Sequence, residues 1–440
     1  MTPAGTAAEA TGAGAAATAS ETDVLVVGAG LAGLRCARVL TDAGLDVQVW
    51  EAGDAVGGRI RTDVVDGHRC DRGFQLLNPA YAAVRAWVDA PALGLQSFGA
   101  GVVAGTDEGR LLLGDPLRAT RTLPSTLRHV APRALDVLPL ARWAAPLLRH
   151  PAGRHLAHHL TSGGDTDLRT ALDRAGVHGL LRRVLDRFLS GVVLDDSTSS
   201  AFALLLLRSF LTGVPGLPAQ GMQALPEQLA APLGARVRLA HRVERVGPAG
   251  PRGVLVEGPA GSVRARRVVV ATDGVDAAGL TALEPVRTRG VVTTWFATDE
   301  PVGLRSATEA RMLHVDAREV PAGPLVNTAV VSAAAPTYAP EGSHLVQGSA
   351  LLRRGTAPAT DGEIRRHAGL LLGVDTSSWR VVVRHEVEHA LPAQPAPLAA
   401  RRRQALDSGV VVCGDHRDTA SIQGALVSGD RAARTVLTDL

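Results

Sequence analysis

The chain has 440 residues, of which 46% are hydrophobic and 20% charged, a globular composition with room for two or three domains. The formal net charge is only +3, and the sequence pI of 9.1 reflects a near balance of acids and bases, which argues against a nucleic-acid partner. All 46 basic residues are arginine, which excludes Schiff-base and general-base chemistry by lysine.

The first 20 residues are rich in Ala, Gly, Thr and Ser and have no positive charges followed by an apolar run. They therefore predict a disordered tail and not a signal peptide. Cys36, Cys70 and Cys413 have neither metal-ligand spacing nor the density of a disulfide scaffold. The most apolar run, 201–207, is too short to span a membrane. We therefore expect a reduced, cytoplasmic protein without a membrane span.

A glycine-rich turn near the start of the chain carries the clearest signal. Residues 23–27 are an apolar run typical of a buried parallel strand, and a helix is predicted over 31–43. Gly28, Gly30 and Gly33 lie between and within them. In such a turn the first glycine allows the bend, the second lets a pyrophosphate approach the backbone, and the third lets helix and strand pack closely.

The second predicted strand, 47–50, ends at Glu51. An acid about twenty residues after the glycine turn is placed to bind the ribose hydroxyls of an adenine dinucleotide. The helix N-terminus would supply unpaired N–H groups and a positive dipole end for the phosphates. Strand, turn, helix, strand and acid in this order predict a dinucleotide site; the alternative is a structural glycine turn.

Gly58 and Arg59 lie in a G-G-R-x-R-T loop shortly after Glu51. An acid-ended strand followed by this loop resembles the flavin amine oxidase, phytoene desaturase and protoporphyrinogen oxidase superfamily of FAD-dependent oxidoreductases. The resemblance implies that the loop holds the FAD pyrophosphate, and Arg59 has the geometry to clamp a phosphate bidentately. The alternative is a basic surface loop.

The following segment, 71–79, reads D-R-G-F-Q-L-L-N-P. It resembles the D-x-G segment that brings the superfamily's chain towards the isoalloxazine ring. G-F-Q followed by Tyr81 is also similar to a bacterial and plant branch of FAD-dependent oxidoreductases. The resemblance implies that Gln75 and Asn78 face the flavin or the substrate, with ordinary turn chemistry as the alternative.

Helical spacing dominates from 117 to about 211. A helix with Asp165 or Thr166 as its N-cap is predicted to end near residue 176. A second helix is predicted to end at residues 190–191, and an apolar third to cover 201–211. Related enzymes build the lid of a substrate cavity from such an insert. The alternative is that these leucines simply form core.

Strands dominate the next part of the chain. Residues 218–229 resemble the segment where the superfamily returns to its FAD domain, and Val243 matches the position whose backbone reads the adenine. The predicted strands are 236–246, 253–257, 262–265, 268–271, 291–297, 326–332, 345–350 and 381–390. Trp295 and Tyr338 are the aromatic candidates for the substrate face, and both lie in the part of the chain from 286 to 399.

The C-terminal part resembles the superfamily's second FAD signature. A buried strand, 409–412, is followed by Gly414 and Asp415, and then by a helix that starts near residue 421. The resemblance implies that Gly414 and Asp415 bind the cofactor, with Asp415 at its ribityl or phosphate end. It also implies that the N–H groups of Ile422 and Gln423 face the flavin N1–O2 locus, where negative charge develops on reduction.

Two possible metal signals are rejected. His385 and His389 form an H-E-x-x-H pattern, which binds zinc only on a helix, whereas the alternation here predicts a strand and roughly 13 Å between their Cα atoms. His155, His158 and His159 have no carboxylate or cysteine nearby in sequence. We predict no metal site, and because Cys413 ends a buried strand outside any attachment motif, we predict non-covalent FAD.

The predicted fold class is α/β. A Rossmann-like, discontinuous FAD-binding domain would combine 21–90, 215–285 and 400–440, after a disordered tail at 1–20. An α+β substrate domain with a mixed sheet and a helical insert would combine 91–214 and 286–399.

The predicted function is an FAD-dependent oxidoreductase that transfers a hydride from a C–N or C–C bond of an apolar or amine substrate to flavin N5. No catalytic side chain is assigned. Many amine oxidases use a lysine near N5 to assist oxygen, so its absence favours a dehydrogenase or desaturase. The alternatives are a non-catalytic prenyl carrier with the GDP-dissociation-inhibitor-like fold, which would not need Glu51 or Asp415, and an NAD-only dehydrogenase, which leaves the C-terminal signature unexplained.

Overall fold

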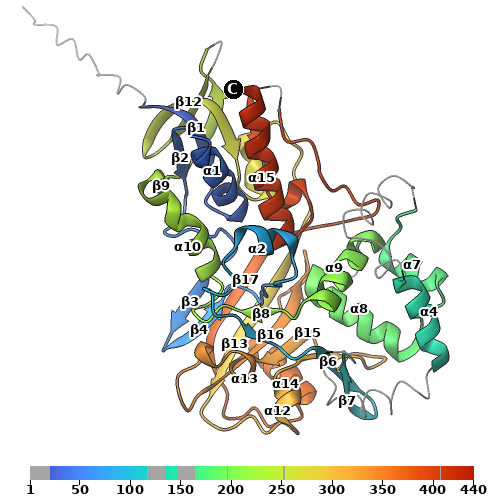
Figure 1. The fold of residues 1–440 in the computed structure, drawn as a ribbon. Helices are drawn as coiled ribbons and strands as arrows, with labels where there is room; N and C mark the ends of the chain where they lie inside the picture. Colours follow the sequence, from blue (N-terminus) through green and yellow to red (C-terminus); the bar gives the residue numbers. More distant parts are fainter. Residues whose placement is uncertain are drawn as a thin grey trace, which may run out of the picture.

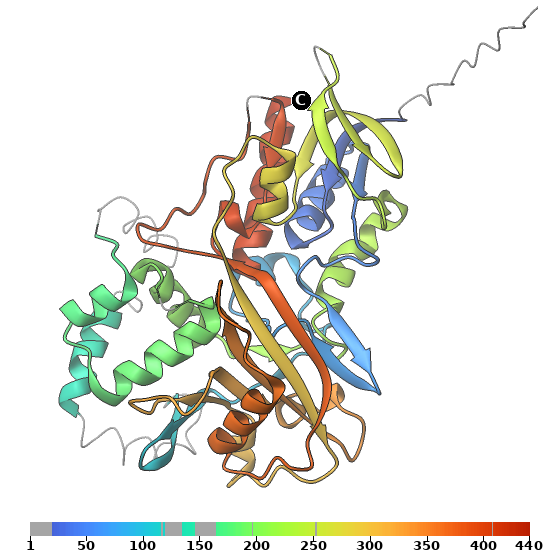
Figure 2. The same cartoon turned by 180° about the vertical axis from the view of Figure 1, so that it is seen from behind.

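The computed structural model describes residues 20–115, 118, 134–145, 164–195, 197–250, 253–406 and 408–440. The predictions for the N-terminal tail and for the three histidines at 155, 158 and 159 lie outside these residues. Two seven-stranded sheets occupy opposite ends of the molecule, and a group of helices lies beside the second sheet (Figures 1 and 2).

The first sheet has the order β10-β11-β12-β1-β2-β9, with β18 paired to β12. Its central strands β12, β1, β2 and β18 are parallel, as the apolar runs predict. The predicted strands at 262–265 and 268–271 are one strand, and the stretch 236–246 is divided between β9 and β10. The bounds are β1 (Ser20–Val27), β2 (Val47–Trp50), β9 (Val237–Arg238), β10 (Arg245–Pro248), β11 (Val254–Gly258), β12 (Gly261–Val270) and β18 (Val410–Val412).

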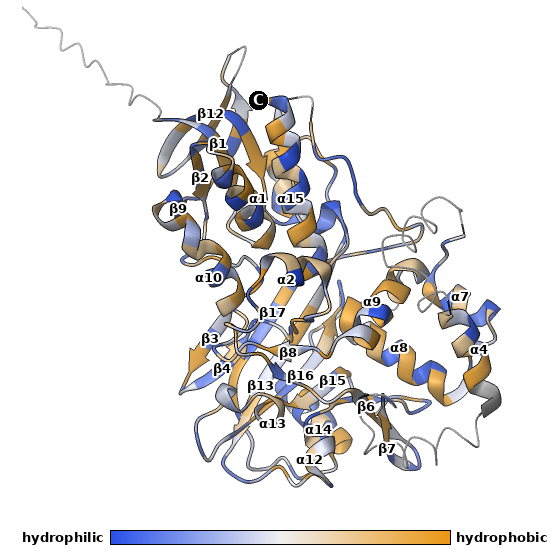
Figure 3. Cartoon of the chain, in the orientation of Figure 1, coloured by the Kyte–Doolittle hydropathy of each residue, from blue (hydrophilic) through white to orange (hydrophobic). Residues whose placement is uncertain are grey.

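Helices α1 (Leu31–Asp42) and α15 (Ile422–Asp439) lie side by side against the first sheet. Figure 3 colours the strands beneath them as largely hydrophobic, and Val26, Val49 and Val269 are buried there without exposure. The two helices can approach closely because Gly429 has no β-carbon. A β-carbon at this position would overlap the Ala32 carbonyl. Nearby lie α10 (Ala224–Ala230), η3 (Ala231–Arg236), α11 (Gly274–Leu280) and η5 (Asp415–Arg417).

The second sheet has the order β17-β13-β16-β15-β14-β6-β7 and is mixed, since only the pairing of β14 with β6 is parallel. The bounds are β6 (Gly101–Thr106), β7 (Gly109–Gly114), β13 (Thr288–Thr298), β14 (Leu313–Asp316), β15 (Leu325–Val330), β16 (His344–Leu352) and β17 (Arg380–Pro392). The strand predicted across the H-E-x-x-H pattern is therefore confirmed. Around this sheet lie α12 (Ala307–Ala310), α13 (Val331–Ala334), η4 (Pro336–Tyr338) and α14 (Asp361–Leu372).

The described part of the helical insert comprises α4 (Ala134–Ala144), α7 (Leu168–Arg174), α8 (Gly179–Val193) and α9 (Ser200–Thr212). The N-cap of α7 is Asp167, not Asp165 or Thr166. Asp165 is buried instead and accepts hydrogen bonds from the start of α9 and from Leu398 N. Helix α8 continues to Val193, three residues past the predicted end, and closes with Leu194 in the left-handed conformation.

Short elements connect these layers. They are β3 (Thr62–Val65), β4 (His68–Asp71), α2 (Ala82–Trp87), β5 (Gln96–Ser97) and β8 (Gly216–Leu217). Strands of the first sheet fall almost entirely in the ranges predicted for the FAD-binding domain, and those of the second sheet in the ranges predicted for the substrate domain; the division into domains stays a prediction. Within the described residues, none of the helices combines the length and the apolar character needed to cross a bilayer.

Asp71, at the end of β4, forms hydrogen bonds with segments from several parts of the chain, including two from the second sheet and its surroundings. Its carboxylate accepts hydrogen bonds from Thr62, from Met222 N and from the Tyr338 hydroxyl, and its carbonyl accepts one from Trp295 Nε1. Burial raises the pKa of Asp71 to about 6, and the three hydrogen bonds to the carboxylate only partly oppose that rise.

We predict that Asp71→Asn stabilises the protein at alkaline pH. The folded-state pKa lies above the ordinary value of 3.8, so the stability present below that value is lost as the pH rises through 6. The loss amounts to about 3 kcal/mol of unfolding free energy. Urea unfolding should therefore show a gain for the variant at pH 8 that disappears at pH 4. An equal effect at both pH values would contradict a buried carboxylate that titrates near 6.

Candidate functional site

A cavity of about 970 Å³ runs from the carboxyl ends of the central strands of the first sheet to the second sheet and the helical insert. Its lining brings together most of the residues predicted from sequence. Those that line it are Gly28, Gly30, Glu51, Gly58, Arg59, Gln75, Asn78, Val243, Gly414, Asp415 and Ile422. Segments from both ends of the chain therefore meet at one site, as binding at the carboxyl edge of a parallel sheet requires.

The three glycines of the first turn differ in what surrounds them. Gly28 has φ +103°, and a β-carbon there would lie 3.0 Å from the Ala271 carbonyl oxygen. Gly33 does not line the cavity; a β-carbon on it would overlap the Gly28 carbonyl oxygen. Gly30 has no atom within 4 Å of its β-carbon position and opens into the cavity. The three positions therefore differ in the space around them, and their roles toward a pyrophosphate stay a prediction.

The N-terminus of α1 is open to a ligand. Its N-cap is Gly30, which has no side chain to accept from the first-turn N–H groups, and Leu31 and Ala32 also line the cavity. Glu51 stands beside it, with one oxygen accepting from Ala29 N at 2.7 Å and the other from Gly53 N at 2.8 Å. These bonds hold the carboxylate at the cavity wall, where it can accept from ribose hydroxyls.

Arg59 is engaged by the protein itself. One terminal nitrogen donates to Asp415 Oδ1 at 2.7 Å and the other to the Ala390 carbonyl at 2.8 Å. Each terminal nitrogen therefore already has one protein acceptor and keeps one further N–H. Arg59 also lines the cavity, and its phosphate clamp stays a prediction.

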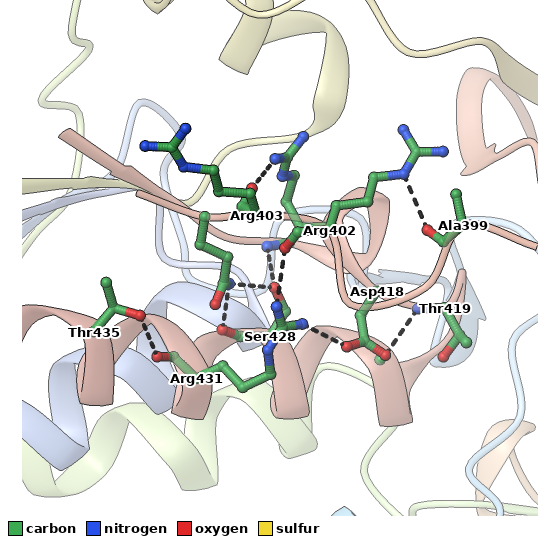
Figure 4. Close-up of polar contacts among 12 residues, drawn as sticks. Ala399, Arg402, Arg403, Asp418, Thr419, Ser428, Arg431 and Thr435 are labelled. Carbon is green, nitrogen blue, oxygen red and sulfur yellow. Dashed lines mark hydrogen bonds and ion pairs between the residues drawn. The ribbon is translucent and has the colours of Figure 1, made fainter. Parts of the chain in front are cut away.

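The C-terminal wall of the cavity is held from behind by a polar network (Figure 4). Arg431, on α15, donates to Asp418 at 2.8 Å and to the Arg402 carbonyl at 2.9 Å. Asp418 in turn accepts from Thr419 N. These bonds fix the segment that leads to Ala420 and Ser421, which line the cavity.

His416 is buried beside Asp415, and neither of its ring nitrogens has a hydrogen-bond partner among the described residues. Burial lowers its pKa to about 4. The imidazole is therefore neutral at physiological pH and adds no charge next to the ion pair of Arg59 and Asp415.

We call the part of the cavity lined by first-sheet segments and the start of α1 the dinucleotide cradle. The sequence analysis did not predict several residues of this cradle. Val243 lines the cavity, and so do its neighbours His241 and Arg242. Trp50 also lines it, and its ring meets that of His241 edge-on with centroids 5.3 Å apart. A polar pair directly before a predicted adenine-reading position was the available signal.

Gln75 and Asn78 behave differently although both line the cavity. Gln75 Nε2 donates to the Arg59 carbonyl, while its buried Oε1 has no partner in the described structure. Asn78 Oδ1 accepts from Ala80 N within the local turn, and its Nδ2 donates to the distant Ser209 carbonyl. Both polar atoms of the Asn78 side chain therefore have protein partners.

Three further predicted residues are not part of the cavity lining. Trp295 and Tyr338 are fully buried in the core, and the polar atom of each side chain donates a hydrogen bond to Asp71. Neither residue therefore forms the substrate face. They were chosen because aromatic residues are few, but a strand residue can face either side of a sheet. The Gln423 side-chain carbonyl accepts a hydrogen bond from Ala83 N. The backbone N–H of Gln423, for which the prediction was made, lies in the first turn of α15.

The far end of the cavity is made by residues that sequence reasoning assigned to core or left unremarked. Phe188 and Phe210, from α8 and α9, meet edge-on with ring centroids 5.0 Å apart. Asn327 and Ser349, from β15 and β16, lie opposite each other in the sheet. Asn327 is the only amide in the six-residue buried strand Leu325–Val330, which is a signal that could have been used.

The histidines of the H-E-x-x-H pattern have separate partners. His385 Nε2 contacts Asp63 at 2.9 Å, and His389 Nδ1 contacts the Thr288 hydroxyl. Across the described ranges, three or more His, Cys, Asp or Glu side chains do not come together in a group able to hold a metal ion.

The residues present fit FAD. A glycine-lined helix N-terminus with free N–H groups suits a pyrophosphate, Glu51 suits a ribose, and the start of α15 suits a ring that becomes negative on reduction. Cys36, Cys70 and Cys413 are all buried, and none of them lies in the cavity lining. The cavity therefore presents no thiol for attachment of the cofactor.

Comparison with curated proteins gives partial matches. The chain is 34% identical to a putrescine oxidase from Kocuria rosea over 58% of this chain and 57% of that protein. It is 31% identical to a putative flavin-containing monoamine oxidase from Mycobacterium tuberculosis over 57% and 56%, respectively. The match thus spans little more than half the length of these relatives.

Among solved structures, a putative protoporphyrinogen oxidase from Exiguobacterium sp. 255-15 superposes with a TM-score of 0.69 at 16% identity, covering 96% of this chain and 99% of that one. A putrescine oxidase bound to putrescine gives 0.65 at 20% identity, covering 95% and 99%. At these identities the likeness shows the fold, and it confirms the predicted fold class.

A family model described as flavin containing amine oxidoreductase matches residues 31–437. It covers nearly the whole chain, beginning within the glycine turn, after the predicted strand 23–27 and residues 28–30, and it includes the C-terminal signature. The match confirms the predicted superfamily, the flavin cofactor and the oxidoreductase class. The chain therefore belongs to the family of flavin-containing amine oxidoreductases.

Proposed function

We propose that this protein uses non-covalently bound FAD to oxidise a small organic substrate by taking a hydride from a C–N or C–C bond. The observation that carries the proposal is the continuity of one cavity, which joins the dinucleotide cradle to a largely apolar end. The names of the putrescine and monoamine oxidase relatives support amine oxidation in those proteins. The prenyl-carrier and NAD-only alternatives have no support in the family match.

We assign FAD-binding roles to the lining residues. The α1 N-terminus at Gly30 would hold the pyrophosphate, Glu51 the ribose, and the Val243 backbone the adenine. Asp415 would bind the ribityl or phosphate end while Arg59 balances its charge. The N–H groups at Ile422 and Gln423 would face the pyrimidine edge of the flavin.

Bound FAD supplies the hydride acceptor, and the protein contributes binding, orientation and exclusion of water. The substrate loses one hydride and one proton, so a new double bond forms between carbon and nitrogen or between two carbons. The apolar end of the cavity would keep water from the reacting carbon, and the proton lost from the neighbouring N–H or C–H group would end in bulk solvent outside the cavity. We assign no side chain as acid or base.

The electron acceptor follows from residue types. The chain has no lysine, so no ammonium group holds a water beside the flavin. We therefore propose that reoxidation by oxygen is slow and that another acceptor takes the electrons.

Anaerobic bleaching tests the function directly. The purified protein should be yellow, and its flavin band should bleach with a member of a panel of amines, carotenoid precursors and porphyrinogens. Admission of air should restore the band only slowly. A colourless protein that cannot be reconstituted with FAD would contradict the proposal, and rapid recovery in air would contradict the slow oxygen reaction.

Gly30 and Gly33 of the first turn provide a matched pair of variants for the cofactor site. Gly30→Ala should leave the fold intact, because its φ of −74° suits alanine and its β-carbon meets no protein atom. It should weaken FAD binding by tenfold or more, on the order of 1.4 kcal/mol, because the methyl group occupies the path of the pyrophosphate. Fluorescence titration of the apoprotein with FAD measures this change.

Gly33→Ala is the control, since its methyl group would overlap the Gly28 carbonyl oxygen and not enter the cavity. It should lower the unfolding free energy by roughly 1–3 kcal/mol. If Gly30→Ala bound FAD as tightly as the wild type, the pyrophosphate would not lie at this turn.

A further inference from the structure

We infer that the substrate is an uncharged, mostly apolar molecule with a hydrogen-bond-accepting group, and that Asn327 is the positioning residue for that group. The inference rests on the proposed function, which makes the far end of the cavity the substrate chamber. We define the substrate chamber as the part of the cavity lined by α8, α9 and the second sheet.

The substrate chamber is free of charge. Its described lining is aliphatic and aromatic apart from Asn327 and Ser349, and includes Phe188, Val192, Leu206, Phe210, Leu313 and Val387. The charged residues in the described lining come instead from the first-sheet segments and the 59–72 loop, as Glu51, Arg72 and Asp273 do. A charged substrate in the substrate chamber would thus lose its hydration without gaining a partner of opposite charge.

Three acids directly neighbour this lining in sequence, and none of them alters that conclusion. Glu386 and Glu388 flank Val387 on β17, but both are exposed and neither lines the cavity. Asp195 follows Leu194, which lines the cavity, but its Oδ2 pairs with Arg289 Nε at 2.7 Å. Its Oδ1 accepts from the backbone N–H and the hydroxyl of Ser197. Because Arg289 balances its charge, Asp195 offers no uncompensated anion to an ammonium group.

A chain of hydrogen bonds orients the amide of Asn327. Thr293, Ser349 and Asn327 occupy facing positions on the adjacent strands β13, β16 and β15. The Ser349 hydroxyl donates to Gln347 Oε1 at 3.0 Å and therefore accepts from Thr293 at 2.9 Å. Gln347 Nε2 then donates to Asn327 Oδ1 at 3.1 Å.

Every bond in this chain constrains the next, so the Asn327 carbonyl is used and its Nδ2 is left as a donor. Among the described residues Nδ2 has no acceptor, and Asn327 lines the cavity. Gly191 of α8 leaves the space for it, since a β-carbon there would lie 2.6 Å from Nδ2. The substrate chamber therefore presents an amide N–H whose direction is set by buried neighbours.

An amide N–H discriminates by charge. It donates to a carbonyl, hydroxyl or ether oxygen or to an unprotonated nitrogen, each of which has a lone pair. A protonated amine has only donors, so it meets this N–H with no bond to form and with unfavourable charge. A diamine that carries two positive charges is excluded most strongly.

Ligand perturbation of the flavin absorbance tests the inference without turnover. The FAD-loaded protein is titrated at pH 7.5 with octan-2-one, with octylamine and with putrescine, of which the last two are cationic at that pH. Octan-2-one should bind saturably, and at least tenfold more tightly than octylamine, while putrescine should cause no perturbation.

Two variants at one position separate hydrogen bonding from packing. Asn327→Leu should weaken octan-2-one binding roughly five- to tenfold, the factor expected for one lost hydrogen bond. Asn327→Asp should weaken octan-2-one and strengthen octylamine, because it places a negative charge at the same point.

Thr294→Val is the matched control. Thr294 neighbours Thr293 on β13 and is equally buried, but its hydroxyl donates to Asp361 of α14, on the face away from the cavity. This variant should lose stability and keep the octan-2-one affinity of the wild type.

Tighter binding of octylamine or putrescine than of octan-2-one to the wild type would overturn the inference while leaving the proposed function intact. An unchanged octan-2-one affinity in Asn327→Leu would overturn the role of Asn327. If both Asn327 variants failed to fold, the three wild-type titrations would still decide the charge of the substrate. A protein that holds no FAD would instead remove the proposed function and this inference with it.

Discussion

The ion pair between Arg59 and Asp415 joins side chains 356 positions apart, and the cavity depends on it. The same guanidinium donates to the Ala390 carbonyl at the end of the second sheet. One planar group thus fixes the N-terminal loop, the C-terminal strand end and the exit of β17 relative to one another. Charge-assisted bonds of this kind are stronger than neutral ones and specify direction as well as distance. All three segments line the cavity that contains both the dinucleotide cradle and the substrate chamber.

The two ends of the cavity differ in electrostatics for a physical reason. The cradle concentrates helix N-termini and paired charges, which suit an anionic dinucleotide. The substrate chamber is walled by helices α8 and α9 and by buried strands, where an isolated charge would be expensive. Its polar lining residues, Asn327 and Ser349, are consequently neutral. The Ser349 hydroxyl is satisfied by Thr293 and Gln347, while Asn327 Nδ2 is left to a ligand. Behind the cradle, the charged groups of Arg431 and Asp418 likewise satisfy each other through a hydrogen bond.

Local rules predicted the parts of the site that depend on backbone geometry. Gly28, Gly30 and Gly33 were predicted to have three different roles, and the structure gives each of them different surroundings. The same rules failed where a side chain can face either way or find another partner. Trp295 and Tyr338 turned to Asp71 and the core. Asp165 was predicted to cap a helix but is buried between two other segments.

The sequence by itself determined the α/β class, the flavin cofactor and the elements of the cradle, because a strand, a glycine turn and an acid at set spacing are local properties of the chain. Only the tertiary structure decided what the substrate meets. Phe188, Phe210 and Asn327 come from a helical insert and a separate sheet, and no spacing relates them. The direction of the Asn327 amide depends on Gln347 across the sheet, and such pairings exist only once the strands are in register.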